Sequence, residues 1–186
     1  MPFAHRLCYD KSMKMRRGFT IVEMLVVIVV IAILATIVVV SYANIQKRAR
    51  DEIRKQDLTS LAKAIEIYSN DNGPMTSGSG CGSAGNGLGW LNYTYSGYTS
   101  MMDCLKNAKA INSTILPPTK TVSCSSGNLN CDAYMKYTCN QSGQIVTYLY
   151  ANLETVAHSS AATDGTCDGS LDSNYGMNYY LKIIER

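Results

Sequence analysis

The chain reads Lys14-Met15-Arg16-Arg17-Gly18-Phe19-Thr20-Ile21-Val22-Glu23-Met24-Leu25 and then stays apolar as far as Val40. Between Phe19 and Val40 only Thr20, Glu23 and Thr36 are polar. At ~1.5 Å per residue a helix over this stretch spans roughly 33 Å, which matches the ~30 Å hydrocarbon core of a bilayer. The stretch therefore predicts a membrane-spanning helix.

Glu23 is the unusual residue of this stretch. A carboxylate inside an apolar span costs on the order of 2.5–3.5 kcal/mol on insertion scales, so such a residue normally has a partner. One interpretation places Glu23 at the level of the lipid headgroups, where the positive end of the helix dipole favours a carboxylate. The other interpretation gives Glu23 a cationic partner.

The residues from Arg16 to Leu25 resemble the class III signal of type IV prepilins and of the related pseudopilins. In that family a membrane-bound prepilin peptidase cuts after the glycine and methylates the new amino terminus. The resemblance implies that Gly18 is the last residue of a leader and that Phe19 becomes N-methylphenylalanine. It also implies an assembly role for Glu23, whose carboxylate would meet the α-amine of a neighbouring subunit, cationic below its pKa of ~8.

The leader, residues 1–18, carries much of the basic character of the chain. Without it the formal net charge changes from +3 to −1, so bulk charge gives no reason to expect nucleic-acid binding. A basic leader indicates a cytoplasmic N-terminus, although five cations also follow the span between Lys47 and Lys55. The resemblance and the cysteines together favour a single pass through the inner membrane, with the N-terminus inside and the C-terminal part exported.

The basic cluster from Lys47 to Lys55 has two interpretations. It either forms a solvated helix face that contacts lipid headgroups, or it makes ion pairs with acidic residues of neighbouring subunits. The first is the simpler one, because charge clusters on helices are usually solvated.

Beyond Val40 the helix is expected to continue. Apolar residues recur mostly every four positions, and neither proline nor glycine occurs between Phe19 and Asn72. The pattern predicts one helix of roughly 52 residues, with a transmembrane first half over 19–40 and an amphipathic second half over 41–73. Gly73 and Pro74 supply its stop signal.

Residues 74–186 are expected to form an exported head. The region 74–132 begins with many glycines and serines and is predicted to be mainly loop, with a weak helical period over Met101–Ile111. The region 133–186 is predicted to be an antiparallel sheet, with strands over Ala133–Cys139, Ile145–Ala151 and Tyr175–Ile184. The expected fold class is α+β, the pilin fold, in which one long helix packs on a small antiparallel sheet with disulfides.

Six cysteines lie beyond the leader, all in the predicted head. An even number in an exported domain predicts three disulfides, which stabilise small domains with modest cores. The pairs expected here are Cys81–Cys104, Cys124–Cys131 and Cys139–Cys167.

No cofactor is expected, and calcium is the alternative. Asp164, Asp168 and Asp172 bring several oxygens into a short stretch with glycines, and major pseudopilins of type II secretion bind calcium near this end of the chain. The spacing does not fit an EF-hand, and Asp-Gly pairs are common in ordinary turns. His158 is the one histidine beyond the leader and has no nucleophile motif beside it, which argues against an enzyme.

Taken together, the sequence predicts a structural subunit of a type IV pilus-like filament for adhesion, motility or DNA uptake. The alternative is a pseudopilin of a type II secretion or competence system, and the third reading is a membrane-anchored enzyme or receptor. The implied partners are other pilins, the prepilin peptidase, an inner-membrane assembly platform and, before assembly, membrane lipid. DNA or surfaces are further candidate partners of the finished cell-surface filament.

Overall fold

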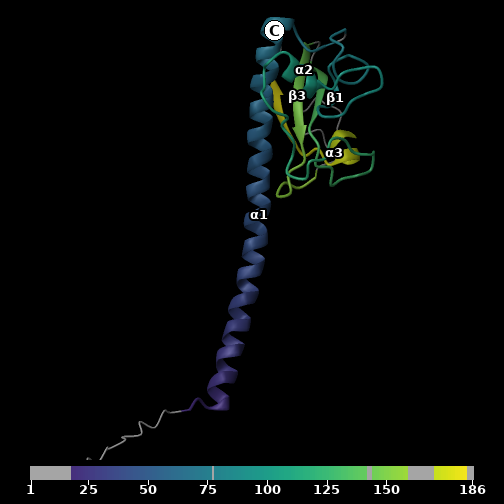
Figure 1. Cartoon of the computed structure of the whole chain (residues 1–186). Helices are drawn as coiled ribbons and strands as arrows, with labels where there is room; N and C mark the ends of the chain where they lie inside the picture. The colour runs from purple at the N-terminus through teal and green to yellow at the C-terminus, as the bar shows by residue number, and fades with distance from the viewer. Residues whose placement is uncertain (1–17, 77, 142–143, 159–169, 184–186) are drawn as a thin grey trace, which may run out of the picture. The chain divides into compact units, whose positions relative to one another are not determined.

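The computed structural model describes residues 18–76, 78–141, 144–158 and 170–183. The chain divides into two compact units, residues 1–43 and residues 44–186. The long helix α1, Ile21–Asn72, contributes to both units and has 52 residues. It begins two residues later than predicted and ends at the predicted position, where Gly73 takes a positive φ of 79°. Figure 1 labels α1, which is purple at its N-terminal end and changes to blue along its length.

The second unit contains a four-stranded sheet in which neighbouring strands run antiparallel, in the order β1-β2-β3-β4. Its strands are β1 (Gly89–Trp90), β2 (Met135–Gln141), β3 (Gln144–Ala151) and β4 (Tyr179–Ile183). The longest ladder joins β2 and β3, from Met135 opposite Tyr150 to Gln141 opposite Gln144. The helix and the small antiparallel sheet confirm the predicted pilin-like α+β fold.

Side chains of β3 alternate between two cores, one on each face of the sheet. Leu149 and Ala151 join the core that contains Leu58, Leu61 and Ile65 of α1. Tyr148 and Tyr150 point into the second core, with Trp90 and Leu171. This period of two explains why a single strand can bury apolar residues on both faces. The C-terminal half of α1 is therefore held to the sheet by apolar packing.

Several boundaries differ from the sequence prediction. The strand expected from Ala133 begins at Met135, and the strand expected from Tyr175 begins at Tyr179, as β4. Tyr175 is instead the last residue of a short helix, α3 (Ser170–Tyr175), which the sequence prediction missed. The predicted helix over Met101–Ile111 is present as α2 (Met101–Asn107), with the Ser100 side chain accepting from the Asp103 N–H at its N-terminus. The strand β1 was also not predicted.

Candidate functional site

Thr20 and Glu23 form a reciprocal cap at the start of α1. The Glu23 carboxylate accepts from the backbone N–H of Thr20 over 2.7 Å and from its hydroxyl over 2.8 Å. In return, the backbone N–H of Glu23 donates to the Thr20 hydroxyl over 3.2 Å. This arrangement is a capping box, which satisfies N–H groups that a helix start leaves without partners. The structure thus gives Glu23 a partner within its own chain, which the sequence prediction did not foresee.

The apolar side chains around this cap and beyond it are exposed within the described part of the chain. Phe19 is 78% exposed and Ile21 86% exposed, and the large apolar residues that follow, as far as Val38, are also exposed. Among the described residues, one helix is long and apolar enough to cross a membrane, and it is α1. Side chains of this kind need lipid or protein around them, which together with the N-terminal sequence indicates membrane anchoring.

A second site surrounds Arg54 in the other unit. Its guanidinium donates to Asp132 over 2.7 Å, to Asp51 over 2.8 Å and to Glu154 over 3.0 Å. Glu154 also accepts two hydrogen bonds from Arg50, each over 2.6 Å. The Arg54 side chain is only 4% exposed. These five residues, named here the Arg54 cluster, join α1 to two segments far away in the sequence.

Asp51 is the most heavily bonded carboxylate of the Arg54 cluster. Besides Arg54 it accepts from the backbone N–H groups of Glu154 and Thr155 and from the Thr155 hydroxyl. Burial by itself would raise the pKa of Asp51, but these hydrogen bonds hold it below the usual value. The side-chain hydrogen bond from Arg50, with help from Arg54, lowers the pKa of Glu154 to about 2. Both carboxylates are therefore charged at neutral pH.

The basic stretch 47–55 is thus divided into two kinds of residue. Arg50 and Arg54 belong to the Arg54 cluster, and Lys55 lies 3.6 Å from Glu52. Lys47 and Arg48 are exposed, and no ion pair joins either of them to another residue of the described ranges. Only these two cations of the five remain available for a headgroup or another molecule.

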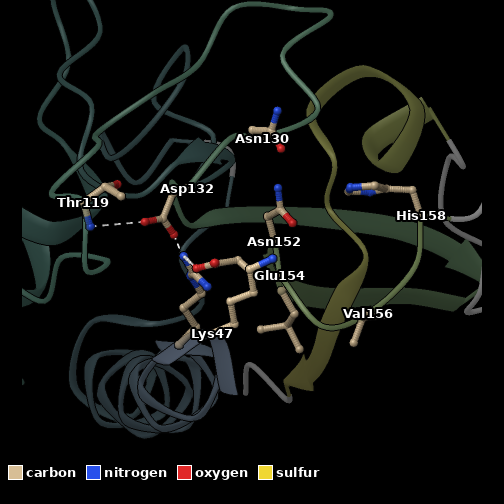
Figure 2. A pocket seen from close by; sticks show the side chains of 10 residues that line it. Lys47, Thr119, Asn130, Asp132, Asn152, Glu154, Val156 and His158 are labelled. Atoms are coloured by element: carbon tan, nitrogen blue, oxygen red, sulfur yellow. Dashed lines mark hydrogen bonds and ion pairs between the residues drawn. The ribbon is translucent and has the colours of Figure 1, made fainter. Parts of the chain in front are cut away.

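A polar pocket of about 440 Å³ lies beside the Arg54 cluster. Figure 2 shows Lys47, Asn152 and His158 around it, with Asp132 and Glu154 close to each other. Its lining residues are Lys47, Arg54, Thr119, Asn130, Asp132, Asn152, Leu153, Glu154, Val156 and His158. Sequence reasoning missed this pocket because its walls come from segments more than 100 positions apart.

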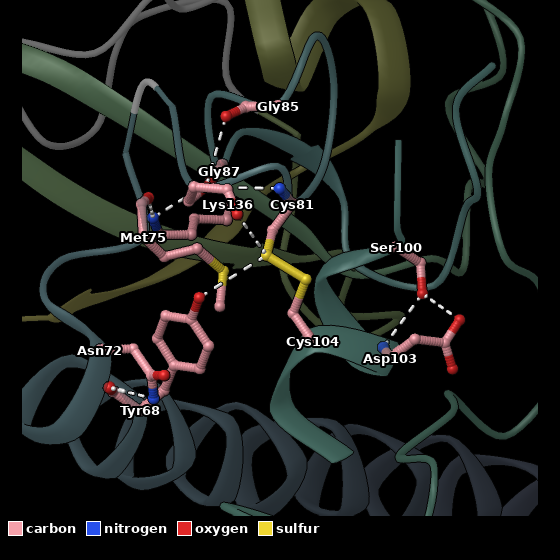
Figure 3. The surroundings of a disulfide bond; sticks show 11 residues. Tyr68, Asn72, Met75, Cys81, Gly85, Gly87, Ser100, Asp103, Cys104 and Lys136 are labelled. Atoms are coloured by element: carbon pink, nitrogen blue, oxygen red, sulfur yellow. Dashed lines mark hydrogen bonds between the residues drawn. A yellow bond between two sulfur atoms is a disulfide. The ribbon is translucent and has the colours of Figure 1, made fainter. Parts of the chain in front are cut away.

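Two disulfides are present in the described head, Cys81–Cys104 and Cys124–Cys131. They are two of the three pairs expected from the sequence. Of the third pair, Cys167 lies outside the described residues, as does the side chain of Cys139. Figure 3 shows the Cys81–Cys104 bond, with the Tyr68 hydroxyl 3.7 Å from the Cys81 sulfur.

A buried lysine holds the glycine-rich loop next to this disulfide. Lys136 of β2 is fully buried, and its ammonium donates to the backbone oxygens of Met75 over 2.7 Å and of Gly87 over 3.0 Å. Gly87 has a positive φ of 69°, and a Cβ there would lie 1.9 Å from the Met75 oxygen. The close approach explains why glycine is required at this position.

The calcium prediction falls mostly outside the described residues, which include neither Asp164 nor Asp168. Asp172 is described, and it is a buried residue of α3 whose carboxylate lies 2.8 Å from Nδ1 of His158. Within the described ranges no group of three or more histidine, cysteine or acidic residues is placed to hold a metal ion.

The N-terminal sequence defines the class of protein to which this chain is related. Residues 13–39 match the family described as the prokaryotic N-terminal methylation motif. Together with the pilin-like fold, this match makes the N-terminal region similar to that of prepilins and pseudopilins.

Particular relatives fall into two groups. The chain is 38% identical over 65 residues to the type IV wide pilus major component PilA4 of Thermus thermophilus, which covers 35% of this chain and 50% of that protein. It is 36% identical over 64 residues to the type II secretion system core protein G of Pectobacterium carotovorum, covering 34% and 41%. For the core protein G of Escherichia coli K12 the identity is 37% over 57 residues, covering 31% and 39%. The chain thus matches about half or less of these relatives. No solved structure matches it.

Proposed function

We propose that this chain is a structural subunit of a type IV pilus-like filament. The observation that carries the proposal is the prepilin motif over residues 13–39, followed by a helix whose apolar side chains are uncovered. Prepilin peptidase would cut after Gly18 and methylate Phe19. The subunit would wait in the inner membrane with its leader in the cytoplasm and would then be drawn by an assembly platform into a surface filament.

Burial of the apolar half of α1 among identical helices replaces its lipid contacts in this proposal. Each large apolar side chain that packs against a neighbouring helix stabilises the filament through van der Waals contacts. Glu23 acts in register selection, since its carboxylate can exchange its contacts with Thr20 for the α-amine of a neighbouring subunit. The relatives are named as filament and secretion components, which supports a structural and not a catalytic role.

A pseudopilin of a type II secretion system is the second candidate. It is favoured by the similarity to type II secretion core proteins G from several bacteria. Both candidates share the processing site, the helix and the assembly residue, and they differ in whether the filament reaches the cell surface.

Mass spectrometry of the N-terminal peptide tests both candidates. Filaments sheared from the cell surface and the membrane fraction would be digested separately. A methylated peptide that begins at Phe19 and is abundant in the sheared fraction is the expected result. The same peptide confined to membranes would favour the pseudopilin, and an uncut leader in all fractions would contradict both.

A further inference from the structure

The pocket beside the Arg54 cluster is balanced in charge. Its lining contains two cations, Lys47 and Arg54, and two carboxylates, Asp132 and Glu154. Arg54 is engaged with both of these carboxylates at 2.7 and 3.0 Å. Lys47 is left as the lining cation with no ion pair to the described residues. The charge of the lining that remains unpaired is therefore the cation of Lys47, which suits an anionic group of a ligand.

Lys47 is the end of the pocket that suits an anion. It is exposed, and it follows Val40, the last residue of the apolar stretch, by only seven positions in the same helix. Lysines just beyond the end of an apolar span extend their ammonium groups to the level of the lipid phosphates. In a membrane-anchored chain, a phosphodiester is therefore an anion within reach of such a lysine.

The other end of the pocket offers hydrogen-bond acceptors. Nδ2 of Asn152 donates to the backbone oxygen of Leu129 over 2.8 Å, so its Oδ1 is the atom left to accept. Nδ1 of His158 lies 2.8 Å from the Asp172 carboxylate, which can only accept when ionised. In the neutral imidazole this leaves Nε2 as an acceptor. Figure 2 shows Asn152 between Lys47 and His158, with the imidazole directed towards it.

We propose that this pocket binds the zwitterionic headgroup of a phosphatidylethanolamine lipid, with the phosphate at Lys47 and the ammonium group at Asn152 and His158. The volume of about 440 Å³ leaves room for the headgroup together with water. The inference rests on the proposed function, because the subunit must first lie in a membrane. It adds a lipid-recognition site that would hold the head next to the bilayer until assembly begins.

Native mass spectrometry of the full chain tests this binding. The chain would be extracted from membranes in detergent, stripped of lipid, and mixed with phosphatidylethanolamine or phosphatidylglycerol of identical acyl chains. The matched variants are Lys47→Gln and Lys63→Gln, since Lys63 is an exposed lysine of α1 that does not line this pocket. Soluble glycerophosphoethanolamine and inorganic phosphate would serve as competitors.

Wild-type and Lys63→Gln chains are expected to bind phosphatidylethanolamine more tightly than phosphatidylglycerol. Lys47→Gln loses one charge-assisted contact to the phosphate that both lipids share, so it should bind both of them roughly tenfold more weakly. Glycerophosphoethanolamine should compete and inorganic phosphate should not. Equal binding of the two lipids, undiminished binding of both in Lys47→Gln, or equal competition by inorganic phosphate would overturn the inference. A chain that never enters the membrane fraction would instead contradict the proposed function, so the two failures are distinguishable.

Discussion

The guanidinium of Arg54 donates to the carboxylate of Asp132 over 2.7 Å and so joins α1 to a residue 78 positions later in the chain. Both side chains are buried, at 4% and 10% exposed. A buried ion pair is expensive to form, and removal of one partner leaves the other charged and without solvent. This asymmetry makes Arg54 the most informative residue for the stability of the head.

Arg54→Met should lower the free energy of unfolding of the head by about 3–5 kcal/mol, because it leaves Asp51 and Asp132 buried without their cation. Trp90 is the one tryptophan of the chain and is buried in the second core, so its fluorescence during urea unfolding of the detergent-solubilised chain reports on the head. The matched control is Arg50→Met, which removes an arginine that is 36% exposed and should cost much less stability than Arg54→Met, because solvent screens its ion pair with Glu154. Equal losses of unfolding free energy in the two variants would show that the burial of Arg54 does not determine its contribution to stability.

Acid should destabilise the head through Glu154 and Asp51. Both have lower pKa values in the folded chain than in the unfolded chain, so the unfolded state binds more protons as the pH falls below about 5. Their stabilising contribution is complete above the unfolded pKa and is lost towards the folded pKa, which for Glu154 is about 2. The urea concentration at the midpoint of unfolding should therefore decrease as the pH is lowered from 6 to 3.

Asp57 acts in the opposite direction, because burial raises its pKa in spite of the hydrogen bond from Tyr134. Its contribution decreases as the pH rises, so the fall in acid should be partly offset. Glu154→Gln should flatten the pH profile while leaving the Asp57 contribution in place. A profile as steep as that of the wild type in this variant would exclude Glu154 as its source.

The elements that could be predicted are those with a periodic pattern in their own sequence. The elements that were missed form only through contacts with distant parts of the chain. The helix to Asn72 was predictable because its apolar period is not interrupted before Gly73. The two residues of β1 show no alternation of their own, and they are a strand only because they pair with β2. In the same way, the sequence indicated that 47–55 is basic but not that Arg54 would meet Glu154, which lies 100 positions away. Glu23 was recognised from the motif, whereas its cap with Thr20 required the geometry.

Lys136→Met should loosen the glycine-rich loop, because the backbone oxygens of Met75 and Gly87 would lose a charged donor. The expected cost is about 1.5–3 kcal/mol, the range for a hydrogen bond to a charged group. Hydrogen exchange measured by mass spectrometry should become faster over residues 75–89 and stay unchanged in α2. Lys182→Met is the matched control, since Lys182 is an exposed lysine of β4. Exchange over 75–89 that stays slow in Lys136→Met would mean that other contacts hold the loop.

Two roles are open to Glu23: a cap for its own helix and a partner for a neighbouring subunit. Thr20→Ala removes the hydroxyl that exchanges hydrogen bonds with Glu23 and should cost the helix start about 1 kcal/mol. The carboxylate remains in this variant, so it can still meet the α-amine of another subunit. We expect Thr20→Ala to leave the amount of sheared filament within about twofold of the wild type, since a frayed first turn is a small cost, and Glu23→Ala to abolish assembly.

The peptide that begins at Phe19 serves as the control in this comparison, because its abundance in membranes reports whether each variant is still cut. Equal loss of filaments in Thr20→Ala and Glu23→Ala, with normal cutting in both, would assign Glu23 to the cap alone. Assembly that survives in both variants would remove Glu23 from the assembly mechanism. Thr20 makes the two outcomes separable, because its hydroxyl can be removed while the charge of Glu23 is kept.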